Sequence, residues 1–66
     1  MWATNEKVVA YFVYRHSDKW IMSKEIKGLM AATKACNAFN ASSRYLCKIG
    51  RVIETESGEK INRFED

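Results

Sequence analysis

The sequence contains few side chains whose types and spacing suit catalysis or metal binding. His16, Ser17 and Asp18 are the three residue types of a hydrolase triad. Neighbours along a turn point in different directions, so these side chains cannot line up as base, nucleophile and orienting acid. A structural zinc site normally takes four ligands, and the single histidine with Cys36 and Cys47 supplies only three. The sequence therefore predicts no catalytic residues and no zinc site.

The glutamates and the glycines also give little indication of a metal site or a phosphate-binding loop. Glu54, Glu56 and Glu59 lie where an extended segment runs into a turn, and carboxylates there more often keep a chain solvated than bind a metal ion. The three glycines are isolated from one another, whereas a phosphate-binding loop needs several close together. We expect no cofactor and no enzymatic activity.

Basic residues dominate the middle of the chain. Residues 26–53 contain no acidic side chain and five basic ones, which are Lys27, Lys34, Arg44, Lys48 and Arg51. Such a segment is attracted to phosphates or to an acidic protein surface. The net charge is only +3, and the acidic segment 54–66 would repel a polyanion. We therefore expect a protein or protein complex as the partner, with direct nucleic-acid binding as the alternative.

Length and composition limit the class of protein. A chain of 66 residues that is 47% hydrophobic predicts a single domain, residues 1–66, with a core but no deep pocket. Its longest apolar run, residues 8–14, is about a third of the roughly 20 residues that a membrane-spanning helix needs. Glu6 interrupts the basic region that a signal peptide would need, and two cysteines are too few for a secreted disulfide framework. We expect a cytoplasmic protein with free, buried thiols and no membrane contact.

The first half of the chain predicts a β-hairpin. Residues 8–14 are almost all β-branched or aromatic, which indicates a central strand at about 8–15. Polar residues then form a turn, and residues 20–26 return as a second strand. In this register the numbers of facing residues sum to 35, which pairs Arg15 with Trp20, Val13 with Met22 and Tyr11 with Lys24.

The period of the apolar residues changes after Gly28. Leu29, Ala32, Cys36 and Phe39 recur at intervals of three and four, which predicts an amphipathic helix at about 29–41. An alternative interpretation starts the helix at Ser23.

Alternation returns after the helix and completes the predicted fold. It indicates a third strand at about 44–54 and a possible short strand at 60–64. The order of elements defines an α+β domain, a two-layer β-β-α-β(-β) sandwich with a three- or four-stranded sheet and one helix on one face. Because a helix separates strands of the same sheet, we expect the third strand to lie parallel beside the first.

The two faces of this sheet differ in composition. The face expected to pack on the helix carries Val8, Ala10, Phe12, Tyr14, Ile21, Tyr45, Cys47, Ile49 and Ile53. The opposite face is aromatic and basic, and a monomer seldom exposes such apolar area without using it. We expect this second face to bind the partner, and the candidate contact residues are Tyr11, Arg15, Trp20, Met22, Lys24, Arg44 and Lys48.

Three other interpretations of that face stay open. The C-terminal segment could cover it with Ile61 and Phe64, or a second copy of the chain could cover it in a homodimer. The two faces could also be exchanged, because a slip of one residue in register moves every side chain to the other side of the sheet.

The organisation of the chain resembles that of small phage-encoded inhibitors. A hairpin, a short Ala-rich helix, a strand and a charged tail within 66 residues are similar in order and size to the host RNA polymerase inhibitor of short-tailed coliphages and to several anti-CRISPR proteins. No residue motif carries this likeness, so it transfers no functional residues. It implies a rigid domain that acts in the host cytoplasm by occupying and blocking a surface of a host nucleic-acid-processing or defence complex.

Overall fold

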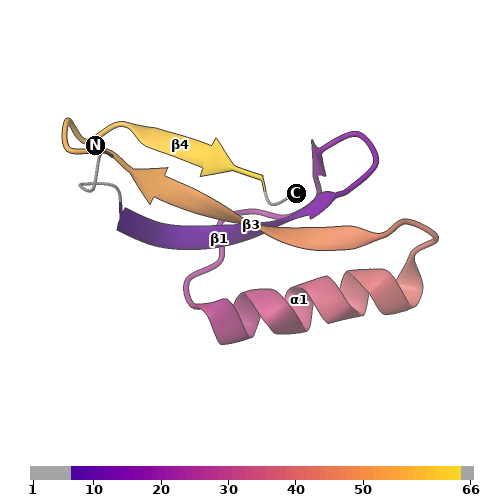
Figure 1. The fold of residues 1–66 in the computed structure, drawn as a ribbon. Helices are drawn as coiled ribbons and strands as arrows, with labels where there is room; N and C mark the ends of the chain where they lie inside the picture. Colours follow the sequence, from indigo (N-terminus) through magenta and orange to yellow (C-terminus); the bar gives the residue numbers. More distant parts are fainter. Residues whose placement is uncertain (1–6, 65–66) are drawn as a thin grey trace.

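The computed structural model describes residues 7–64 and shows one helix packed against a four-stranded antiparallel sheet (Figure 1). The α+β fold expected from the sequence is confirmed. The sheet has the order β2-β1-β3-β4. The elements are β1 (Lys7–Arg15), β2 (Trp20–Ile21), α1 (Leu29–Ser42), β3 (Cys47–Glu54) and β4 (Lys60–Arg63).

The direction of β3 differs from the prediction, because β3 pairs with β1 in the antiparallel sense. The rule that strands joined through a helix run parallel applies to the two strands that the helix connects. Those strands are β2 and β3, and both run opposite to β1, which lies between them. β3 is therefore parallel to β2, and the prediction of a strand parallel to β1 was wrong.

The hairpin keeps its predicted register only near its turn. Arg15 pairs with Trp20 and Tyr14 with Ile21, and the backbone N–H of Met22 donates to the carbonyl of Val13 at 2.8 Å. Lys19, the last residue of the turn, has a φ of 62°. This left-handed conformation lets the four-residue loop close.

Beyond Met22 the predicted second strand is interrupted. The hydroxyl of Ser23 accepts the N–H of Val13 at 2.9 Å and takes the place of a backbone partner. Pairing then resumes at Ile26, which forms a bridge with Tyr11. Lys24, the partner expected for Tyr11, is displaced from that position, and only Trp20–Ile21 of the expected 20–26 form a regular strand.

The helix lies on the face of the sheet that carries Val13. Val13, Cys36 of α1 and Cys47 of β3 form a buried cluster. Partly buried side chains surround this cluster, and they are Met22, Ile26, Ala35, Phe39 and Ile49. The helix itself matches its predicted range, and it begins after Gly28, whose φ of 93° favours glycine.

The opposite face of the sheet is also buried, because the sheet curls away from the helix (Figure 1). Ala10, Phe12, Tyr14 and Val52 are at most 2% exposed there. The ring of Phe64, just after β4, covers them at 5.4 Å from the ring of Phe12 and 4.9 Å from that of Tyr14, measured between centroids. We call this set of five residues the concave core.

Contacts between the two edges of the sheet fit this curvature. Glu25, on the β2 side, lies 4.0 Å from Lys60 at the start of β4, although β1 and β3 separate these edges in the sheet order. Gly50 of β3 also contributes, because it faces Phe12 and leaves room for the ring against the strand backbone.

The assignment of faces was therefore right for β3, and it was wrong for Ala10, Phe12 and Tyr14 of β1. Cys47 and Ile49 pack toward the helix as expected, but Phe12 and Tyr14 lie on the other side. Two of the open interpretations, exchanged faces and coverage of the sheet by Phe64, therefore both apply to β1. Strand composition could not separate the two faces of β1, because both are buried.

Candidate functional site

Two loops meet at one end of the sheet. The first is the turn 16–19, and the second is the segment 43–46 between α1 and β3. They are held together where β1 ends, because Arg15 pairs with Cys47 and the backbone N–H of His16 donates to the carbonyl of Leu46 at 2.9 Å. We call residues 15–20 and 43–48 together the loop end.

Large apolar side chains are exposed at the loop end. The exposed fractions are 63% for Trp20, 50% for Tyr45 and 59% for Leu46. Trp20 faces Arg15 across the hairpin, and the turn that exposes Tyr45 is fixed by a 2.9 Å hydrogen bond from its N–H to the hydroxyl of Ser43. The loop end therefore presents aromatic and aliphatic surface on a backbone with fixed hydrogen bonds.

Arg15 joins the two loops. Its Nε and Nη2 donate to the two carboxylate oxygens of Asp18 at 2.8 and 2.6 Å, and its guanidinium carbon lies 4.6 Å from the centre of the Tyr45 ring. The hydrogen bonds from Arg15 lower the pKa of the Asp18 carboxyl to about 2, and those to Asp18 raise the pKa of Arg15. The side chain is thus held between an ion pair and an aromatic ring.

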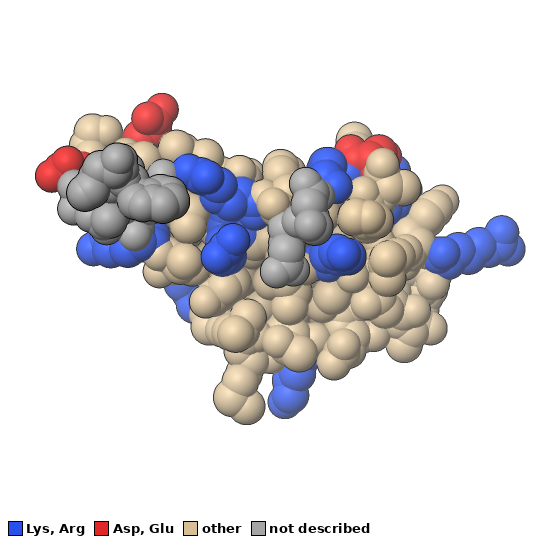
Figure 2. Space-filling model, in the orientation of Figure 1, with Lys and Arg blue, Asp and Glu red and all other residues tan. Residues whose placement is uncertain are grey.

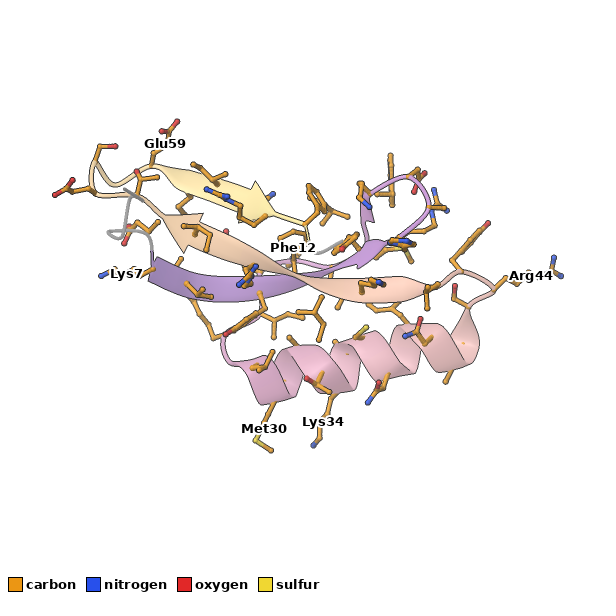
Figure 3. The ribbon with its side chains drawn as sticks, in the orientation of Figure 1. Lys7, Phe12, Met30, Lys34, Arg44 and Glu59 are labelled. Atoms are coloured by element: carbon orange, nitrogen blue, oxygen red, sulfur yellow. The ribbon has the colours of Figure 1, made fainter. Side chains whose placement is uncertain are left out.

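The remaining charges at the loop end are basic. Lys19, Arg44 and Lys48 belong to it, and Asp18, its acidic residue, is already paired with Arg15. Arg44 extends outward from the end of the molecule in Figure 3. In Figure 2, Lys and Arg spread over the visible face, and Asp and Glu lie at its two upper corners.

The predicted contact residues are divided by the structure. Arg15, Trp20, Arg44 and Lys48 all belong to the loop end, but Lys48 faces Tyr14 and therefore lies on the other side of the sheet from Arg15 and Trp20. The other three, Tyr11, Met22 and Lys24, do not join them. Met22 packs against the buried cluster beneath the helix, Tyr11 lines a groove farther along β1, and Lys24 is exposed after the interruption at Ser23.

Tyr45 is an exposed residue of the loop end that the sequence interpretation assigned to the core. The predicted strand 44–54 placed it in alternation with Cys47, but β3 begins only at Cys47. Ser43 could have signalled this, since serine commonly binds a backbone N–H two residues on and forms a turn.

The side chains considered for catalysis or metal binding make other contacts in the structure. The carboxylate of Asp18 binds Arg15 rather than His16. Within residues 7–64, no group of three potential metal ligands comes together. Cys36 and Cys47 are buried and unbridged as predicted, and burial raises the pKa of the Cys36 thiol. A neutral buried thiol is a poor nucleophile.

No family model, curated protein or solved structure matches this chain. No helix in the described part of the chain is long and apolar enough to cross a membrane.

Proposed function

We propose that this protein is a small, non-catalytic protein-binding module that acts by occupying a surface of its partner through the loop end. The observation that carries the proposal is the exposure of Trp20 and Tyr45 on either side of a fixed Arg15. Tryptophan, tyrosine and arginine are the residue types that most often dominate the binding energy of protein interfaces.

The fixed position of Arg15 supports binding. An interface loses affinity when it must immobilise long side chains, at about 0.5–1.5 kcal/mol for each. Asp18 and Tyr45 already restrict the guanidinium before any partner arrives. A rigid surface of this kind suits a stoichiometric inhibitor, whose mode of action is to block rather than to transform its partner.

The charges of the loop end favour an acidic partner surface. Arg44 and Lys48 add positive charge to the loop end, and complementary charge raises the rate of association. The proposed partner is a host complex in the cytoplasm, as the resemblance to small phage-encoded inhibitors implies.

Affinity capture with matched variants tests the proposal. Trp20→Ala removes an exposed ring from the loop end, and Met30→Ala removes an even more exposed side chain, 82%, from the helix. Figure 3 shows Met30 pointing away from the sheet. We expect the unchanged chain and the Met30→Ala variant to capture the same proteins from a bacterial lysate. The Trp20→Ala variant should fail to capture them. Equal recovery by all three would refute the assignment to the loop end.

Nucleic-acid binding is the second candidate, because bases can stack on exposed rings next to basic residues. Titration of single- and double-stranded oligonucleotides separates it from protein binding. Binding at low salt that falls steeply as salt rises, and that Trp20→Ala weakens, would favour nucleic acid as the partner. Absence of binding at about 50 mM salt would exclude it.

A further inference from the structure

A groove lies on the helix side of the sheet, away from the loop end. It has a volume of about 420 Å³ and is open to solvent. Its lining is apolar apart from a phenol and a guanidinium, and it consists of Val8, Tyr11, Leu29, Ile49 and Arg51.

The groove follows from the way the helix covers the sheet. α1 packs on β1 and β3, and β4 lies beyond β3 without helix contacts of its own. An irregularity in pairing between Val8 and Ala10 shifts the start of β1, and Val8 lines the groove opposite the first turn of the helix. Val8 and Leu29 both remain exposed in consequence.

The groove contains a guanidinium, and none of its lining residues carries a carboxylate. Arg51 is exposed and lines the groove, and among residues 7–64 no carboxylate forms an ion pair with it.

We propose that this groove binds a small amphiphilic carboxylate, with its hydrocarbon part against Val8, Leu29 and Ile49 and its carboxylate on Arg51. The apolar lining selects for a hydrocarbon chain, since each buried CH₂ group contributes about 0.8 kcal/mol. The guanidinium selects for a carboxylate, which it can bind through two parallel hydrogen bonds. Tyr11 adds a hydroxyl that can donate to the same group.

This site is independent of the protein-binding surface. It shares no residue with the loop end, so the failure of either proposal leaves the other unaffected.

NMR titration with three probes tests separately whether the apolar lining and Arg51 contribute to binding. Octanoate carries the chain and the charge, 1-octanol carries the chain alone, and acetate carries the charge alone. We expect octanoate to shift the amide signals of the groove residues with the highest affinity of the three. Equal affinity for octanol and octanoate would overturn the role of Arg51, and shifts confined to other regions would overturn the site.

A pair of charge-matched variants completes the test. Arg51→Met and Arg44→Met each remove one guanidinium and keep an aliphatic chain, and both positions are exposed, so the fold is expected to tolerate them. Arg51→Met should weaken octanoate binding about three- to fivefold, as expected for one partly exposed ion pair. Octanol binding should stay unchanged, as should octanoate binding by Arg44→Met. An equal loss in both variants would show only general attraction by positive charge and would contradict the proposal.

Discussion

Gly50 lets the ring of Phe12 lie directly against the backbone of β3. A Cβ added at this position would come within 2.7 Å of Cε1 and Cε2 of that ring. The ring has little room to move, because Phe12 is buried and Tyr14 and Phe64 pack beside it. The need for glycine here therefore comes from packing, and Gly50 has no positive φ to explain it.

We expect Gly50→Ala to lower the free energy of unfolding by about 1–3 kcal/mol, the usual cost of overpacking a core. Urea denaturation followed by circular dichroism measures this. Adding Phe12→Leu to Gly50→Ala should cost less than the sum of the two separate changes, because the smaller side chain relieves the overlap. Strict additivity would contradict a direct contact between the two residues.

The ion pair between Arg15 and Asp18 makes the loop end sensitive to acid. The pKa of Asp18 is lowered from 3.8 to about 2, chiefly by its hydrogen bonds with Arg15. A lowered carboxyl pKa in the folded state means that the stabilisation is complete above about pH 4 and is lost as the pH falls toward 2. Both side chains are solvent-accessible, so salt should weaken the effect.

We expect NMR titration of the Asp18 carboxyl to give a midpoint near 2. In Arg15→Met the midpoint should rise toward 3.8, because the variant removes the hydrogen-bond donors. An unchanged midpoint in that variant would show that Arg15 does not hold the carboxylate in solution.

At the scale of elements, Asn40 joins the end of α1 to the start of β3. Its side-chain oxygen accepts the N–H of Cys47 at 2.7 Å, and its side-chain nitrogen donates to the carbonyl of Cys47 at 3.3 Å. The buried Cys36 thiol donates to the same carbonyl, also at 3.3 Å. These contacts fix the position from which the exposed segment 43–46 leaves the helix.

We expect Asn40→Ala to lower the free energy of unfolding by about 1–3 kcal/mol, since it leaves a buried backbone N–H without its partner. Hydrogen exchange at the amide of Cys47 should become faster. Asn37→Ala, at an exposed position of the same helix, is the control and should not lower the free energy of unfolding, since alanine is the better helix former. An equal loss of stability in both variants would contradict the role of the contact with β3.

The sequence predicted correctly the elements that depend on residues close together in the chain. The spacing of Leu29, Ala32 and Cys36 is a property of one segment, and the helix ends within a residue of its expected bounds. The turn at 16–19 and the register beside it are likewise local. The direction of β3 and the displacement of Ile26 depend on contacts between distant segments, and periodicity carries no information about these.

At the scale of the whole molecule, the curl of the sheet decides which side chains remain exposed. It buries Phe12 and Tyr14 without a second layer of secondary structure, so an apolar strand face is not necessarily a binding face. Arg15 and Trp20 were assigned to the candidate site from the hairpin alone. Tyr45 was not recognised as their neighbour, because its exposure depends on where β3 begins.

The central claim is that the loop end contacts a partner protein, and photo-crosslinking tests it most directly. Tyr45→p-benzoylphenylalanine places a light-activated group at the loop end, and the same substitution at Met30 places it on the outer face of the helix, pointing away from the sheet (Figure 3). We expect light to join the protein covalently to a partner from the position of Tyr45 and not from that of Met30. Cross-linking to the partner from Met30 alone would contradict the claim.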